Sequence, residues 1–204
     1  MWTHYFDVHE PYLDTSLGRA DSDRYDAEIR NVDRAFARLL REMERRVNRP
    51  VIVVLTADHG EEFRDHGGVY HGSTLYDEQN LVPLIIRSPS VPPGRVRAPV
   101  SLVDLAPTLL AGVGLPRPAR MSGDDLGPLV HGRPWDRPVF AETGSLRCVT
   151  LAREALVADL DDGTLELFDL DRDPLERTNL ADARPERAQR RAQRAEQHRA
   201  RPPR

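Results

Sequence analysis

Apolar residues recur at three- and four-residue spacing over residues 21–47. They are Tyr25, Ile29, Val32, Phe36, Leu39, Leu40, Met43 and Val47. This spacing places them on one face of a helix. Ser22 and Asp23 are residues of the kind that cap helix starts, and Arg49-Pro50 is typical of a helix end. The pattern therefore predicts an amphipathic helix in this region.

Continuous apolar runs typical of buried strands occur at residues 51–55 and 82–86. Residues 2–8, which are rich in aromatic and β-branched types, predict an earlier strand. Runs that are apolar on both faces are typical of parallel sheets covered by helices. Because residues 100–113 predict the end of a strand followed by a further helix, the pattern favours an α/β fold with a mostly parallel sheet flanked by helices.

After Trp135 the pattern changes to short runs with strand character. The predicted strands cover residues 139–142, 148–153, 155–160 and 164–170. Asp161-Asp162-Gly163 is typical of a hairpin turn between the last two. We expect an α/β domain over residues 1–134, a small antiparallel subdomain over 135–182, and an Arg-rich terminal helix over 183–204 that is solvated and frays into disorder.

The 204 residues and their 39% hydrophobic content suit one domain with a core, or part of a larger domain. All 29 basic residues are arginines, so a catalytic lysine is excluded and an anion must be held by Arg, His, metal or backbone N–H groups. The net charge of -4 gives no indication of a nucleic-acid partner. No stretch approaches the roughly 20 apolar residues of a membrane span, and nothing in the sequence assigns a compartment.

The strongest chemical motif is Asp58-His59-Gly60-Glu61, directly after the predicted strand at residues 51–55. An adjacent carboxylate and imidazole on a tight turn can both face one divalent cation. The alternative is a polar turn with the histidine in water. His71, in a glycine-rich loop, and His9, in His9-Glu10-Pro11-Tyr12, are further candidates, with a solvated loop histidine as the alternative for His71.

The order of these motifs resembles the second half of the sulfatase family, in the alkaline phosphatase superfamily. The shared features are the His-x-Pro-Tyr loop, the strand ending in Asp-His-Gly-Glu, Tyr76-Asp77-Glu78, Val82-Pro83-Leu84-Ile85-Ile86, and Leu167-Phe168-Asp169-Leu170. The similarity extends over roughly residues 1–182. It implies a partial alkaline-phosphatase-like sandwich and an ester of sulfuric or phosphoric acid as the substrate.

The resemblance also implies roles for individual residues. Asp58 and His59 would be metal ligands; Ca²⁺ is usual in sulfatases, and an imidazole in place of the amide common there makes Mn²⁺ or Zn²⁺ alternatives. His9 matches the histidine that hydrogen-bonds the sulfuryl or phosphoryl group. His71 falls where many sulfatases have a lysine that holds the substrate anion. We therefore assign catalytic roles to His9 and His71.

The family's nucleophile has no counterpart in these residues. It is a cysteine in Cys-x-Pro-x-Arg, or a serine or threonine, whereas Cys148 stands in Leu146-Arg147-Cys148-Val149-Thr150. The family's paired aspartates for the same metal are also missing. We therefore expect an upstream half that supplies them, with Met1 an internal methionine and the isolated chain close to inert.

Two alternatives remain open. One is a phosphodiesterase or phosphoryl transferase on the same scaffold, which the Asp-His pair and the missing lysine favour. The other is a non-catalytic remnant, or a module that must associate with a separately made N-terminal half.

Overall fold

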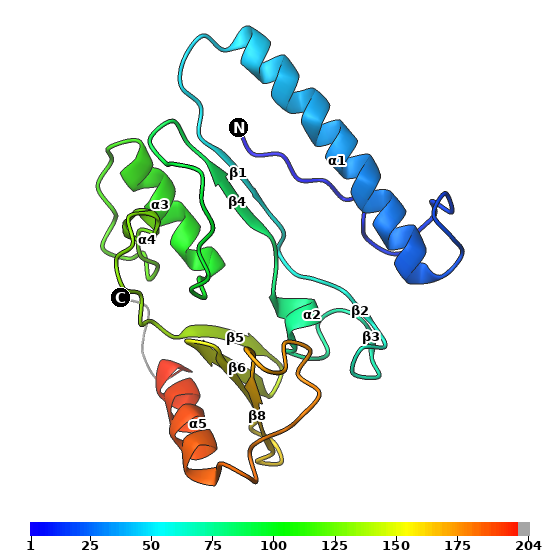
Figure 1. The fold of residues 1–204 in the computed structure, drawn as a ribbon, viewed down its shortest axis with the longest axis vertical. Coiled ribbons are helices and arrows are strands. Elements are labelled where there is room, and N and C mark those ends of the chain that lie inside the picture. Colours follow the sequence, from blue (N-terminus) through cyan, green and yellow to red (C-terminus); the bar gives the residue numbers. More distant parts are fainter. Residues whose placement is uncertain (200–204) are drawn as a thin grey trace. The chain divides into compact units, whose positions relative to one another are not determined.

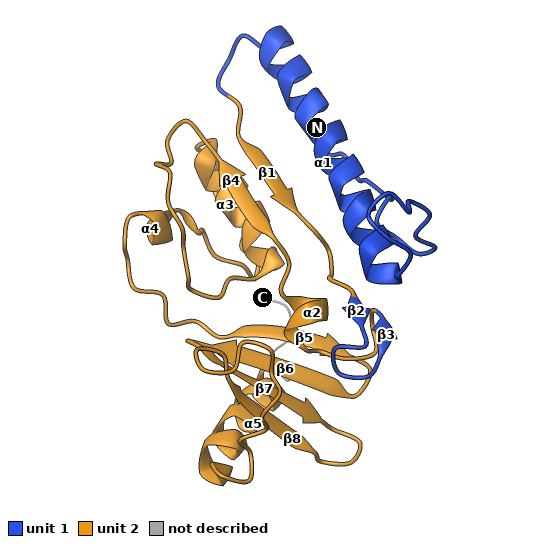
Figure 2. Ribbon diagram, turned by 45° about the vertical axis from the view of Figure 1, so that its right-hand side comes forward, with its two compact units in different colours: residues 1–50, 62–70 blue, residues 51–61, 71–204 orange. Residues whose placement is uncertain are grey.

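The computed structural model describes residues 1–199 and divides into two compact units. Unit 1 comprises Met1–Pro50 and Glu62–Tyr70, and unit 2 comprises Val51–Glu61 and the chain from His71 onward (Figure 2). Each unit is described by itself below.

Unit 1 is built on the long helix α1 (Asp21–Arg46), which confirms the helix predicted from the apolar spacing. The carboxylate of Asp23 accepts a hydrogen bond from the backbone N–H of Ala20 at 3.2 Å. Acidic residues occupy the first turn and Arg45 and Arg46 the last, an arrangement that complements the helix dipole.

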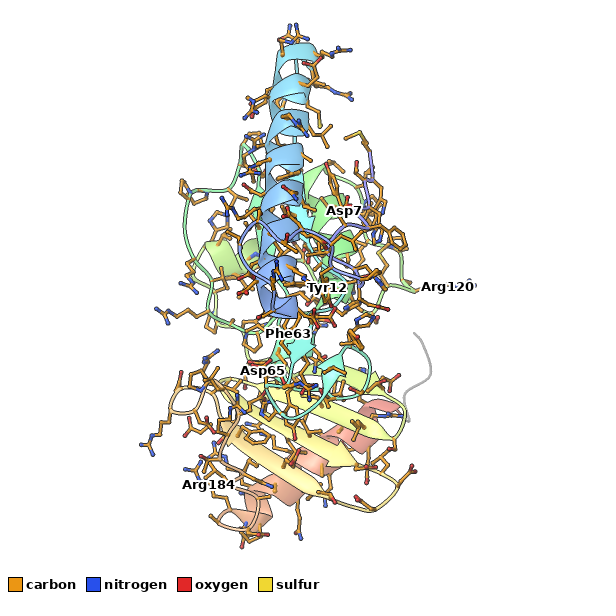
Figure 3. All side chains as sticks on the ribbon, turned by 90° about the vertical axis from the view of Figure 1, so that its right-hand side faces the viewer. Asp7, Tyr12, Phe63, Asp65, Arg120 and Arg184 are labelled. Atoms are coloured by element: carbon orange, nitrogen blue, oxygen red, sulfur yellow. The ribbon has the colours of Figure 1, made fainter. Side chains whose placement is uncertain are left out.

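A short hairpin of β2 (Glu62–Phe63) and β3 (Val69–Tyr70) completes unit 1. Tyr12 lies close to Phe63 (Figure 3), and their ring centroids are 5.8 Å apart. Tyr25 packs edge-on against both rings. Aromatic contacts of this kind hold the hairpin, the loop containing Tyr12 and α1 together within the unit.

The strand predicted over residues 2–8 is not formed. Trp2 is 85% exposed and Phe6 75% exposed. A strand requires a neighbour to pair its backbone N–H and C=O groups, and no strand of unit 1 within the described residues lies beside this segment. Aromatic and β-branched composition alone does not supply that partner.

Unit 2 holds the remaining elements. In chain order they are β1 (Val53–Thr56), α2 (Asp77–Asn80), β4 (Leu84–Arg87), the 3₁₀ helix η1 (Leu102–Asp104), α3 (Leu105–Gly112), α4 (Gly127–Val130), β5 (Val139–Thr143), β6 (Leu146–Leu151), β7 (Glu154–Asp159), β8 (Leu165–Asp169) and α5 (Pro185–Arg199) (Figure 1).

The prediction of a mostly parallel sheet is wrong. β1 pairs antiparallel with β4, and every sheet of the described residues is antiparallel: β1-β4, β2-β3 and β5-β6-β7-β8. Parallel neighbours need a crossover, usually a helix lying along the sheet. The short hairpin of β2 and β3 and the four-residue helix α2 lie between β1 and β4, and no helix there is long enough for a crossover along the sheet. The apolar runs therefore identified the strands but not their direction.

The C-terminal sheet is antiparallel, with its four strands in chain order, as the sequence predicts. Val149, Leu156 and Leu167 are fully buried in its core. α5 packs against this sheet (Figure 1), with Ala188 and Ala195 buried in the same cluster. One face of α5 is thus packed and the other solvated, and residues 200–204 of the tail predicted over residues 183–204 lie outside the described residues.

Among the described residues, none of the helices combines the length and apolar character that crossing a membrane requires.

Candidate functional site

The turn after β1 brings an exposed carboxylate and an exposed imidazole together. Asp58 Oδ1 accepts a hydrogen bond from the backbone N–H of His59 at 3.1 Å. The same oxygen lies 3.9 Å from His59 Nε2. The side chain of Asp58 is 71% exposed, so its oxygens are accessible to an ion from solvent.

A hydrogen bond at Nδ1, the ring nitrogen farther from the contact with Asp58, orients the imidazole of His59. Nδ1 lies 2.9 Å from the carbonyl oxygen of Gly60. A carbonyl only accepts, so Nδ1 donates and Nε2 carries the lone pair of the neutral ring. Metal-binding histidines are commonly oriented in this way, by a backbone carbonyl at the nitrogen that does not bind the metal.

His71 joins this pair from the following loop. Its ring stacks on that of His59 with 3.9 Å between centroids and 25° between planes. His71 Nδ1 lies 3.0 Å from Glu61 Oε1, and the Glu61 side chain is only 4% exposed. A buried carboxylate thus fixes the orientation of the second imidazole. Glu61 stands in the sequence motif, yet no sequence pattern indicated that it would contact His71.

Gln79 connects the two loops of the site. It is 4% exposed, and its Oε1 accepts a hydrogen bond from the backbone N–H of Gly72 at 2.8 Å. Its backbone carbonyl accepts one from Gly60 N–H, also at 2.8 Å. Its Nε2 donates to Thr74 Oγ1 at 2.7 Å. Sequence reasoning missed Gln79, because a glutamine in a short helix gives no signal of contacts made by its side chain.

Gly60 is required at its position because the backbone passes close to α2. A Cβ added there would lie 2.0 Å from the carbonyl oxygen of Glu78. Any larger residue would push the turn carrying Asp58 and His59 away from Gln79.

Asp58 and His59 fit part of a metal site. One cation bonded at about 2.0–2.6 Å to each ligand can bridge their 3.9 Å separation. The described residues contain no group of three or more His, Cys, Asp and Glu side chains placed to hold an ion. The assignment of Asp58 and His59 as metal ligands therefore stays a prediction.

His9 belongs to unit 1, and the other three predicted site residues belong to unit 2. His9 Nδ1 lies 2.9 Å from the carbonyl oxygen of Glu10, and its backbone N–H donates to Phe6 O at 3.1 Å. Val8 just before it has φ 90°, which is unusual for a β-branched residue. The structure thus brings Asp58, His59 and His71 together within unit 2, and the roles of all four residues stay predictions.

Two other reactive side chains of unit 2, the buried Cys148 and the partly buried Tyr76, pack against the C-terminal sheet. Burial raises the pKa of the Cys148 thiol to about 12, so this cysteine is a poor nucleophile at neutral pH. Burial and a hydrogen bond to Glu166 raise the pKa of Tyr76 far above its ordinary value. Tyr76 also packs edge-on against Phe168.

Comparisons with known proteins identify the family to which this chain is similar. The model of the family described as Sulfatase matches residues 1–115. Arylsulfatase K of Rattus norvegicus is 35% identical over 153 residues, which cover 66% of this chain and 27% of that protein. Choline-sulfatase of Rhizobium meliloti (strain 1021) is 31% identical over 188 residues, covering 87% of this chain and 35% of that protein.

A solved structure gives the same picture. The crystal structure of a phosphonate monoester hydrolase from Agrobacterium radiobacter matches with a TM-score of 0.71 and 27% identity, covering 88% of this chain and 40% of that one. The chain therefore spans about a third of the length of its curated relatives, or less. Since the family model matches more than half of the 204 residues, the chain belongs to the sulfatase family.

Proposed function

We propose that this chain is the C-terminal part of a metal-dependent hydrolase of sulfuric esters. The observation that carries the proposal is the pair at the end of β1. Asp58 and His59 lie within reach of one cation, and the carbonyl of Gly60 fixes Nδ1 of His59 as the protonated nitrogen. Their mixed oxygen and nitrogen donors suit Mn²⁺ or Zn²⁺, and Ca²⁺ is the ion usual for sulfatases.

In this proposal Asp58 and His59 hold the cation from one side. With a divalent cation held there, these two residues would provide positive charge that polarises the oxygens of the ester. His71, oriented by Glu61, donates from Nε2 to the anionic ester when its ring is protonated. The two rings stack at 3.9 Å, so the proposed cation ligand and the proposed anion donor lie side by side.

His9 is proposed to hydrogen-bond the sulfuryl group or the leaving oxygen. The nucleophile, an activated hydroxyl, and the remaining metal ligands are proposed to come from a part of the protein outside these 204 residues. Two considerations support this: the chain covers only 27% and 35% of two curated relatives, and Cys148 is buried with a raised pKa.

A phosphodiester or phosphonate monoester substrate is the second candidate. The phosphonate monoester hydrolase from Agrobacterium radiobacter shares 27% of its residues with this chain in the matched region. The Asp58-His59 pair, in place of a carboxylate and an amide, also favours this candidate. Both reactions use attack on a tetrahedral anionic ester, so the same residues serve either one.

The test is an assay of the protein translated from the complete reading frame that contains this sequence. We expect it to hydrolyse an aryl sulfate faster than an aryl phosphodiester or an aryl phosphonate monoester. Asp58→Ala should abolish the activity, whereas Asp161→Ala, in an exposed turn, should leave it unchanged. A strong preference for a phosphorus ester would replace the first candidate with the second, and activity on none of them would favour a non-catalytic remnant.

A further inference from the structure

Positive charge is concentrated on α5, although the whole chain has a net charge of -4. Four arginines of this helix line a shallow depression of about 220 Å³ whose lining includes no acidic residue. They are Arg187, Arg190, Arg191 and Arg194, and we call this surface the arginine groove. Their spacing of three and four residues places them along one side of the helix, over about 10 Å at 1.5 Å per residue.

The groove is held in place by one buried carboxylate. Glu154, at the start of β7, accepts a hydrogen bond from Arg187 Nε at 2.8 Å and one from Arg191 Nη2 at 3.1 Å. Arg184 Nη1 lies 3.6 Å from the same carboxylate. Arg184 Nη1 also lies 3.9 Å from Asp169 Oδ2, so two carboxylates face three guanidinium groups, each with five N–H donors, and a surplus of positive charge remains beside the groove.

The outer arginines are less engaged. Arg190 pairs with the exposed Glu186 at 3.4 Å, a contact of little strength in water. Arg194 makes no ion pair with any side chain that the structure describes. Both are therefore available to an anion, and neither is needed to hold α5 on the sheet.

The chemistry of α5 restricts the kind of anion. Its inner face, with Ala188, Ala192 and Ala195, packs on the C-terminal sheet. The exposed residues described over 185–198 include no large apolar side chain that could enter a membrane. His198 stacks on Phe140 at 3.9 Å and gives nucleic-acid bases no free platform. Guanidinium groups with no apolar or aromatic partner suit the oxygens of sulfate groups on a polar polymer.

We propose that the arginine groove binds a sulfated oligosaccharide, through sulfate groups other than the one that is hydrolysed. The choice of a sulfated ligand rests on the proposed function. Such a site raises the local concentration of a polymeric substrate without touching the reacting ester. Since the groove extends over about 10 Å, it can contact more than one sulfate group of the same polymer.

The test measures binding of fluorescent dextran sulfate to the 204-residue chain. We expect Arg190→Gln/Arg194→Gln to weaken binding at least about tenfold and to lower the salt dependence of binding by up to about two charges. The matched control is Arg30→Gln/Arg41→Gln, which removes the same charge from exposed positions of α1 and should change affinity less than about twofold.

Equal losses of affinity in both double variants would overturn the proposal and favour attraction to the overall charge of the chain. Absence of dextran sulfate binding by the unaltered chain would also overturn the proposal. Unsulfated dextran should not bind. Single-stranded DNA or anionic vesicles would overturn the choice of ligand if they bind the unaltered chain as tightly as dextran sulfate does and bind the groove variant more weakly.

In the protein translated from the complete reading frame, the groove variant should hydrolyse a small aryl sulfate normally. Groove binding without any sulfate-ester hydrolysis would therefore contradict only the proposed function.

Discussion

The hydroxyl of Tyr76 donates a hydrogen bond to Glu166 at 2.7 Å, across 90 positions of sequence. This bond ties the residue before α2 to strand β8. The next backbone N–H, of Asp77, donates to Glu176 at 2.7 Å. Because α2 carries Gln79, which holds both loops of the candidate site, these bonds anchor the site on the C-terminal sheet.

Tyr76→Phe removes only the hydroxyl of this anchor. We expect the free energy of unfolding to fall by about 1 kcal/mol, the usual contribution of one hydrogen bond. Urea denaturation followed by circular dichroism measures the change. Tyr70→Phe, at an exposed tyrosine of β3, is the control and should change stability by less than about 0.5 kcal/mol. Equal losses in the two variants would show that the bond to Glu166 contributes nothing.

Gly60→Ala places a methyl group where the carbonyl of Glu78 lies. We expect a loss of about 1–3 kcal/mol in the free energy of unfolding, because the turn and α2 must move apart. The displaced turn should also bind Mn²⁺ more weakly in isothermal titration calorimetry. Gly94→Ala is the matched control, since a Cβ there meets open space. An unchanged stability and Mn²⁺ affinity in Gly60→Ala would contradict the packing described here.

Asp77 should make stability depend on pH in a defined direction. Burial is the main cause that raises the pKa of its carboxyl, and the charge of Arg153 opposes it. At pH values between 3.8, the pKa of this carboxyl in the unfolded chain, and its higher pKa in the folded chain, the folded chain keeps a proton that the unfolded chain has released. The contribution of Asp77 to stability is therefore greatest below 3.8 and declines as pH rises through the folded pKa.

The measurement compares the unaltered chain with Asp77→Asn in urea titrations at several pH values. The stability difference, unaltered minus variant, should decrease as pH rises above the unfolded value. Asp162 provides a contrast, because hydrogen bonds from Thr164 lower the pKa of that exposed carboxyl. Its contribution is lost as pH falls, so the difference for Asp162→Asn should increase with pH. A difference for Asp77→Asn that is constant or rising would refute the assignment.

Cys148 should be unreactive in the folded chain. Its thiol is buried and has a pKa of about 12, so little thiolate forms at pH 8. Ellman's reagent should therefore label the native chain only as slowly as it unfolds, and label one thiol immediately in urea. Rapid labelling of the native chain would mean that the strand carrying Cys148 is accessible.

The sequence was sufficient for features that depend on local pattern. Apolar spacing predicted α1, and short runs separated by turn residues predicted the four C-terminal strands. It failed where an outcome depends on distant partners. Residues 51–55 have the composition of a buried parallel strand, yet β1 pairs antiparallel with β4. Residues 2–8 have strand composition but no neighbour within their unit to pair with.

The candidate site shows the same division. Asp58 and His59 could be identified because they follow an apolar strand directly. Glu61 and Gln79 could not, because their roles come from contacts with His71 and Gly72 in a loop that folds back. The boundaries of the predicted domains, at residues 134 and 182, stay predictions.

Paramagnetic broadening by Mn²⁺ tests the central claim most directly, because it locates a bound cation in the 204-residue chain without any need for catalysis. A ¹⁵N-labelled chain titrated with Mn²⁺ should lose the amide signals of residues 58–60 and 71 first. Asp58→Ala should abolish this localised loss, while Asp161→Ala should keep it. Broadening centred elsewhere, or unaffected by Asp58→Ala, would contradict the assignment of Asp58 and His59 as metal ligands.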